Sequence, residues 1–79
     1  MDNSGIPLAA RIIRAKRDML EMIAAVEKAK RDAQEARRRA ERMNNEIGAM
    51  RLARAERHLI AVQKELEVYR SENIQLLNS

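Results

Sequence analysis

Seven arginines between positions 37 and 57 form the densest group of anion-binding side chains in the sequence. They are Arg37, Arg38, Arg39, Arg42, Arg51, Arg54 and Arg57. A guanidinium group donates paired hydrogen bonds to phosphate or carboxylate, so the cluster fits contact with nucleic acid phosphates, a phosphorylated surface or an acidic protein face. The alternative is a solvated helical exterior, because Arg is a good helix former and Glu41, Glu46 and Glu56 are interleaved with the arginines.

Catalytic chemistry finds little support in the sequence. His58 is the only histidine, cysteine is absent, and the two glycines lie forty-three positions apart, which excludes a glycine-rich phosphate loop. The carboxylates have basic neighbours at helical spacing, as in Glu27 with Arg31 and Glu35 with Arg39, which is typical of surface ion pairs. We therefore expect no enzymatic activity, no cofactor and no metal site.

The composition predicts an all-α protein that needs a partner. The chain has 79 residues, 46% of them apolar and 35% charged, with one tyrosine, no phenylalanine and no tryptophan. The bias toward Ala, Glu, Lys, Arg and Leu is typical of coiled coils and long helices. So short a chain without disulfides or large aromatic side chains has few means of building a stable core alone.

The limits of the helical region follow from a few residues. Pro7 favours a helix start, since its missing N–H would have no partner in the first turn. From there to position 78 we expect one helical domain, preceded by a flexible lead-in over residues 1–6. The weak point is the group Asn44, Asn45 and Gly48, whose residue types tolerate left-handed dihedrals and end helices. No apolar run reaches the ~18 residues that a membrane span needs.

Two apolar rows with alternating spacings of three and four run along the chain. The first row contains Ile12, Ala15, Met19, Met22, Val26, Ala29, Ala33, Ala36, Ala40, Met43, Ile47 and Met50. The second row contains Leu52, Ala55, Leu59, Val62, Leu66, Tyr69, Asn73 and Leu76. Continuing the spacing of the first row would place the charged Arg54 and Arg57 in it, so the second row is shifted by two positions from the first. A straight coiled coil absorbs single insertions of three or four residues, and a shift of two matches neither.

A reversal of the chain accounts for this slip. We predict an antiparallel helical hairpin, from Pro7 to Met43 and from Gly48 to Leu77, with a turn near residues 44–48. The hairpin sets the small Ala29, Ala33 and Ala36 near the larger Leu59, Val62 and Leu66 and gathers the arginines at a basic tip. The alternative is one long helix in a coiled-coil oligomer, because a glycine inside a helix costs only about 1 kcal/mol.

The apolar arc on each arm is wider than one partner helix can cover. The arc of the first arm consists of Ile12, Ile13, Met19, Leu20, Met22 and Ile23, and the second arm is widened by Leu59, Ile60, Ile74, Leu76 and Leu77. Apolar surface of that breadth indicates further helices. We therefore expect a homo-oligomer, dimeric or higher, in which hairpins form a coiled coil or a four-helix bundle, or docking on another protein.

Two residues of the second row could encode specificity. Asn73 falls at a core-type position, where a buried asparagine can fix register or oligomeric state; the alternative is a frayed, solvated last turn. We expect Tyr69 to pack in the seam, with its hydroxyl reaching water or a carbonyl of the partner helix.

Residues 6–26 are both basic and amphipathic, with Arg11, Arg14 and Arg17 beside Ile12 and Leu20. Such a helix can lie on an anionic membrane. We favour packing against a partner helix, because the first row continues in frame for several more turns. The N-terminus lacks the uncharged core and small-residue cleavage site of a secretory signal, so we expect a cytoplasmic protein or one enclosed in a virion or similar assembly.

The sequence thus leaves several hypotheses about function. The first is a non-enzymatic oligomerisation or protein-interaction module, a structural or adaptor part of a larger assembly of the phage, plasmid or secretion type. The second is a small basic hairpin that binds nucleic acid through its arginine-rich tip, which the formal net charge of +4 allows. The third is peripheral attachment to a membrane through residues 6–26.

Overall fold

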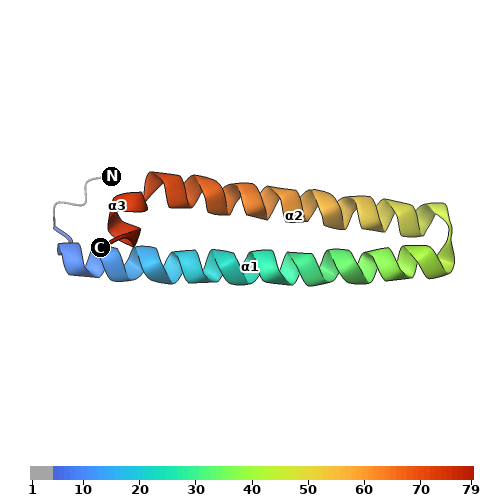
Figure 1. The fold of residues 1–79 in the computed structure, drawn as a ribbon, viewed down its shortest axis with the longest axis horizontal. Coiled ribbons are helices and arrows are strands. Elements are labelled where there is room, and N and C mark those ends of the chain that lie inside the picture. The colour runs from blue at the N-terminus through green and yellow to red at the C-terminus, as the bar shows by residue number, and fades with distance from the viewer. Residues whose placement is uncertain (1–4) are drawn as a thin grey trace.

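The chain folds as an antiparallel helical hairpin, as predicted, and the single long helix is wrong. The computed structural model describes residues 5–79, so the expected flexible lead-in falls mostly outside the described part. Helix α1 spans Leu8–Met43, α2 spans Glu46–Glu72, and a single turn of helix, α3, spans Ile74–Leu77. The rod measures 55 × 19 × 16 Å, with the turn at one end and the beginning of α1 beside α3 at the other (Figure 1).

The turn needs only two residues, both asparagines. Asn44 adopts the left-handed conformation, with φ 47° and ψ 51°, and its N–H donates to the Ala40 carbonyl at 2.8 Å, which closes α1. Asn45 is extended, and its Oδ1 accepts a hydrogen bond from the Gly48 N–H at 2.8 Å. Asn is among the few residue types that tolerate the first conformation and also cap a helix start. This cap explains why α2 begins at Glu46, two residues before the predicted Gly48.

Gly48 allows the two helices to approach closely at the turn. It is the only buried residue among the described part of α2, and a Cβ added to it would lie 3.2 Å from Ala40 Cα and 3.4 Å from Asn45 Oδ1. That spacing is tighter than an ordinary van der Waals contact between carbon atoms. Gly48 therefore serves as a contact point between helices, in addition to being a weak helix former.

Small side chains of α1 form the interior of the hairpin. The buried apolar residues are Ala15, Val26, Ala29 and Ala33, with exposed fractions between 2% and 9%. The rest of the first row as far as Ala40, namely Ile12, Met19, Met22, Ala36 and Ala40, is half-buried, and so is all of the second row, namely Leu52, Ala55, Leu59, Val62, Leu66, Tyr69, Asn73 and Leu76. Larger side chains of α2 thus pack over a thin alanine stripe.

The first row does not run past the turn as the sequence pattern suggested. Met43, Ile47 and Met50 continue its spacing, but they are 52%, 56% and 66% exposed. The reversal at Asn44 changes the direction of the helix axis, so Ile47 and Met50 no longer share a face with α1. Met43 is the last residue of α1 and lines the groove beside Gly48 and Arg51. These three side chains lie on the outside of the closed end of the rod.

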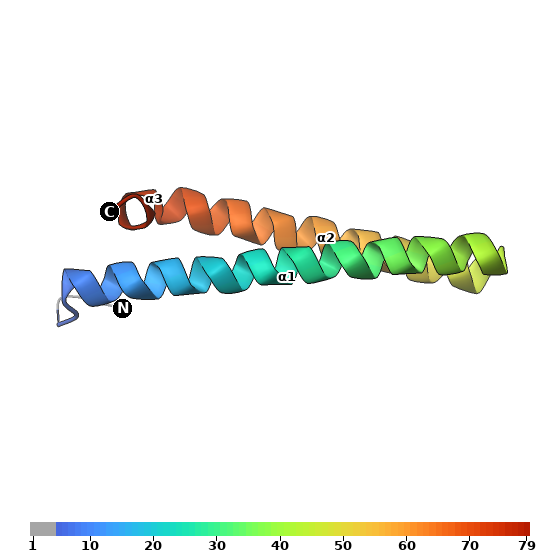
Figure 2. The same cartoon turned by 60° about the horizontal axis from the view of Figure 1, so that its bottom comes forward.

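The open end is held by contacts between α1 and the last two turns of the chain. The Tyr69 hydroxyl donates to the Ala15 carbonyl and approaches Asp18 Oδ2, both at 3.4 Å, and Lys16 Nζ donates to the Ser79 carbonyl at 2.7 Å. Asn73 separates α2 from α3, and its Nδ2 donates to the Tyr69 carbonyl at 2.9 Å. Figure 2 shows α3 turned out of line with α2. The amide of Asn73 therefore bonds within its own helix end, and the predicted Gly48–Leu77 helix is interrupted there.

The contact at Gly48 predicts a steric effect of substitution. Gly48→Val should destabilise the hairpin by about 1 to 3 kcal/mol, because the new side chain forces α1 and α2 apart. Ala49→Val, one position along on the exposed side, is the matched control and should cost only its helix propensity, up to about 0.7 kcal/mol. Urea unfolding followed by circular dichroism measures both; equal losses for the two variants would contradict the close approach.

The environment of Tyr69 predicts a pH dependence. Burial, the charge of Asp18 and the hydrogen bond to Asp18 raise the pKa of Tyr69 above its usual value of 10.0. The protonated phenol is thus favoured in the folded state, and its contribution is present below about pH 10 and lost as the pH rises through the folded pKa. In urea titrations, wild type should lose stability more steeply than Tyr69→Phe above about pH 10. If the stabilities of wild type and Tyr69→Phe change with pH in parallel, the hydroxyl contact is not formed.

Candidate interaction surfaces

One side of the hairpin carries five large apolar side chains that the fold leaves uncovered. We call this the apolar face and define it as Ile13, Leu20, Ile23, Ile60 and Ile74. Four of them are between 52% and 67% exposed, and Ile23 is 36% exposed. These five residues flank the two rows that form the interior. They are the part of the broad apolar arcs that the opposite helix does not cover.

Residues of α1 and α3 line one groove of about 450 Å³ near the open end, and they therefore lie on the same side of the rod. Its apolar walls are Met19, Leu20 and Ile23 from α1 with Ile74 and Leu77 from α3. Ile13 lies seven residues before Leu20 and so two turns away on the same side of α1. The groove therefore joins Leu20 and Ile23 of α1 to Ile74 of α3.

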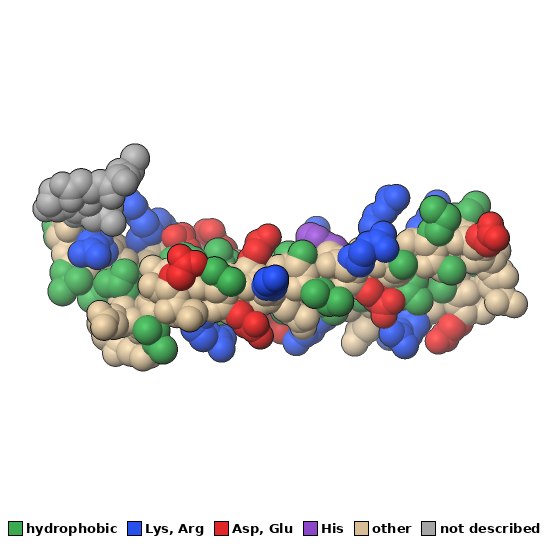
Figure 3. All heavy atoms as spheres, turned by 90° about the horizontal axis from the view of Figure 1, so that it is seen from above, with side chains coloured by type: hydrophobic (Ala, Val, Ile, Leu, Met, Phe, Trp, Pro, Cys, Tyr) green, Lys and Arg blue, Asp and Glu red, His purple; other side chains and the backbone are tan. Residues whose placement is uncertain are grey.

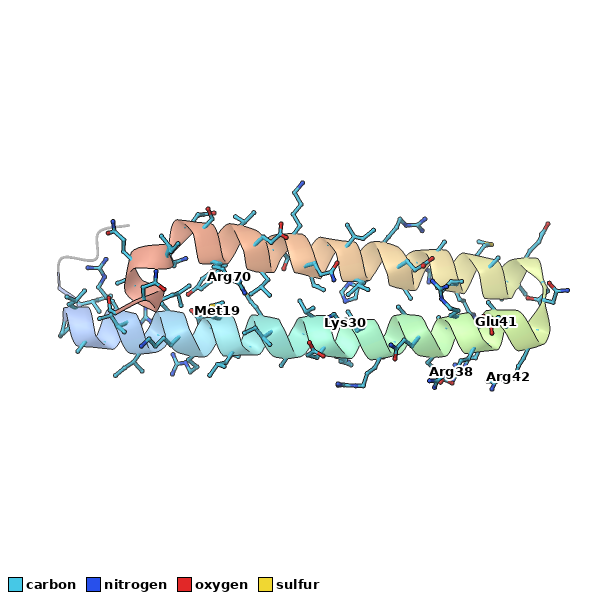
Figure 4. All side chains as sticks on the ribbon, in the orientation of Figure 1. Met19, Lys30, Arg38, Glu41, Arg42 and Arg70 are labelled. Carbon is cyan, nitrogen blue, oxygen red and sulfur yellow. The ribbon has the colours of Figure 1, made fainter. Side chains whose placement is uncertain are left out.

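Ile60 belongs to the same side by its spacing from two residues whose positions are known. Arg70, ten residues after it, lines the groove. Glu56, four residues before it, pairs with Arg37, and Arg37 lies four turns from Ile23 on the same side of α1. Figure 4 looks onto this side, with Met19, Lys30, Glu41 and Arg70 over the space between the helices.

The charges on the apolar face are nearly balanced. Helical spacing assigns to it four basic residues, Lys16, Lys30, Arg37 and Arg70, and five acidic residues, Glu27, Glu41, Glu46, Glu56 and Glu67. Within this set Lys30 pairs with Glu27 at 3.6 Å and Arg37 with Glu56 at 3.0 Å. With four positive and five negative charges, the face carries a formal charge of −1, whereas the whole chain carries +4.

The seven predicted anion-binding arginines all lie in the half of the hairpin near the turn, but they point in different directions. Arg37 reaches across to Glu56 on α2, while Arg38 and Arg39 pair with Glu35 on α1 at 3.9 and 3.2 Å. Within residues 5–79 the remaining four, Arg42, Arg51, Arg54 and Arg57, make no ion pair. The consecutive triplet is thus partly neutralised and divided between faces.

Arginines from both helices occupy the side opposite the apolar face and its outer edge. We call this surface the basic face and define it as Arg39, Arg51 and Arg54, with Arg42 at the outer edge. Arg39 and Arg51 line one groove of about 290 Å³ beside Gly48, and Arg42 and Arg54 each follow by three residues, on the same side of their helix. Arg39 lies two residues after Arg37 and hence about 200° around α1 from it. Figure 4 shows Arg42 directed away from α2, at the outer edge of this face.

No group of three or more His, Cys, Asp or Glu side chains able to hold a metal is found among residues 5–79. His58 is exposed on α2. Figure 3 shows basic and acidic side chains interspersed along the rod, with hydrophobic side chains exposed between them.

The hypothesis that residues 6–26 attach to a membrane concerns a segment that packs against α2 in the hairpin. This segment is the open-end half of α1, and Ala15 and Val26 within it are buried against α2. In the part of the chain that the structure describes, no helix has the length and apolar character required to cross a bilayer.

The apolar residues predicted to meet a partner differ from those that the structure leaves uncovered. The residues predicted as an oligomer or core seam lie between α1 and α2 of one chain, so their contacts are made within the hairpin. The surface open to a partner consists of residues beside the two rows, which the breadth of the apolar arcs had indicated. Comparison of the chain with protein-family models, curated proteins and solved structures finds no match.

The pair between Arg37 and Glu56 predicts a small coupling energy. Both side chains are about half exposed, and exposed ion pairs contribute about 0.2 to 1 kcal/mol. A double-mutant cycle of Arg37→Gln and Glu56→Gln, measured by urea unfolding, should give a coupling in that range. A cycle of Arg31→Gln with Glu56→Gln, which have no contact, should give none. Coupling above about 2 kcal/mol would contradict the exposed geometry.

Proposed function

We propose that the chain is a non-enzymatic interaction module whose hairpin pairs with a second copy through the apolar face. The observation that carries this proposal is the concentration of five large, exposed apolar side chains on one side of the rod. Contiguous exposed apolar surface of this kind marks interaction sites on proteins. In this account the module serves as a structural or adaptor part of a larger assembly.

The limited interior of the single hairpin supports the proposal. Among the described residues the buried apolar set consists of three alanines and one valine, and no large side chain is fully buried. Fully burying a leucine or isoleucine side chain stabilises a fold by about 1.5 to 3 kcal/mol. Most large apolar side chains of the hairpin are only partly buried and therefore contribute less than this. A second hairpin would cover Leu20, Ile60 and their neighbours and complete a four-helix core.

The charge and size of the apolar face favour a second copy of this chain as the occupant. A two-fold interface brings the same face together from both copies, so a strongly charged face would repel itself. This face is close to neutral, with four basic and five acidic residues. A side of 55 by 19 Å has a projected area on the order of 1,000 Å², above the ~800 Å² per partner of a standard stable interface.

Sedimentation equilibrium of two matched variants tests the proposal. Ile60→Glu places a charge in the apolar face, whereas Val68→Glu places the same charge at an exposed apolar position in the groove on the other side of α2, beside Met22 and Ala61. Wild type and Val68→Glu should be dimeric at micromolar concentration, and Ile60→Glu should be monomeric with unchanged helix content.

Two results would overturn the proposal. A wild-type chain that stays monomeric and helical up to about 100 μM, a concentration at which a weak complex with a free energy near −6 kcal/mol would form, excludes self-association. Equal dissociation of both variants would show that pairing does not use the apolar face.

A further inference from the structure

A second surface of the hairpin is suited to a polyanion. The basic face presents Arg39 and Arg42 from the end of α1 beside Arg51 and Arg54 from the start of α2. Residues from positions 39 to 54 of the sequence come together here only because the chain reverses at Asn44 and Asn45. We propose that this face binds the phosphate backbone of duplex nucleic acid.

The balance of charge on this face favours an anion. Asp32 and Glu35 line the same groove as Arg39 and Arg51, and Glu35 accepts a hydrogen bond from Arg39 at 3.2 Å. Arg42, Arg51 and Arg54 make no ion pair within residues 5–79. Two acidic groups against four guanidinium groups leave a surplus of two positive charges. His58, four residues after Arg54, adds a further donor at the same edge.

Duplex nucleic acid fits this chemistry better than the other polyanions. Phosphate oxygens accept the paired N–H donors of guanidinium groups, and arginines fixed on two packed helices keep constant positions along the rod. Single-strand binding uses aromatic stacking, and the one aromatic side chain, Tyr69, lies at the open end. An anionic bilayer is less suited, because Glu41, Glu46, Asn44 and Asn45 surround the closed end and would lose water on insertion.

The basic face does not compete with the apolar face. The two surfaces lie on opposite sides of the rod, so pairing of two copies through the apolar face leaves both basic faces outside. A single hairpin carries the complete basic face, and binding therefore does not require the dimer. The proposal stands on its own if self-association fails.

Fluorescence anisotropy with a labelled 20-base-pair DNA duplex, titrated across a salt series, tests this surface. The variant Arg51→Gln/Arg54→Gln removes two charges from the basic face. The matched control Arg37→Gln/Arg38→Gln removes two charges whose side chains already pair with Glu56 and Glu35. Wild-type affinity should fall steeply with salt. The first variant should bind at least about ten-fold more weakly with a salt slope lower by about two, while the control should stay within about three-fold of wild type.

Three results would overturn the proposal. The first is no binding of wild type at about 50 mM salt, where phosphate contacts are strong. The second is an equal loss in both double variants, which would reflect net charge alone. The third is binding to anionic lipid vesicles without binding to duplex, which would assign the face to membranes. A duplex RNA of the same sequence shows which nucleic acid is preferred, and circular dichroism confirms that both variants remain folded.

Discussion

The close approach of α1 and α2 along a stripe of alanines is the constraint on which the rest of the structure depends. Ala15, Ala29 and Ala33 are nearly inaccessible to solvent, and at the turn a Cβ added to Gly48 would lie only 3.2 Å from the Ala40 Cα. Small residues on one helix let the larger residues of the other reach its backbone. The connection between the helices is only two residues long, Asn44 and Asn45. So short a connection requires helices that lie this close.

A thin interior has consequences for the outside of the molecule. Because alanines occupy the space between the helices, the larger Ile13, Leu20, Ile23, Ile60 and Ile74 remain at the surface on one side. The reversal also places arginines from two separated segments on the other side. The hairpin therefore separates an apolar, nearly neutral face from a basic one, and the two proposed interactions use different sides of one rod.

Much of the fold could be predicted from the sequence, because the signals were periodic and local. The slip between the two apolar rows indicated a reversal, and Asn44, Asn45 and Gly48 marked its place. The start of α2 at Glu46 could not be read from spacing, since it depends on the Asn45 side chain reaching the Gly48 N–H. The break at Asn73 likewise depends on a hydrogen bond to the Tyr69 carbonyl, which has no signature in the apolar pattern.

The candidate surfaces were less predictable than the fold. Arg37, Arg38 and Arg39 formed the most prominent basic run in the sequence, but helical geometry sends consecutive residues about 100° apart. Glu35 and Glu56 also neutralise part of their charge. Pairing with Glu56 joins residues nineteen positions apart and follows only from the register of α1 against α2. The uncovered apolar residues were visible as arcs, but assigning them to one shared face required both helices in place.

The distance between spin labels at the exposed positions Arg17 and Ser71, each changed to cysteine in a chain that has none, tests the doubled-over architecture most directly. Labelled protein is diluted into unlabelled protein so that pairs within one chain dominate the signal. Antiparallel helices packed about 8 to 10 Å apart predict a narrow distribution below about 35 Å. A distance near 80 Å, expected for fifty-four residues of continuous helix at about 1.5 Å each, would contradict the account.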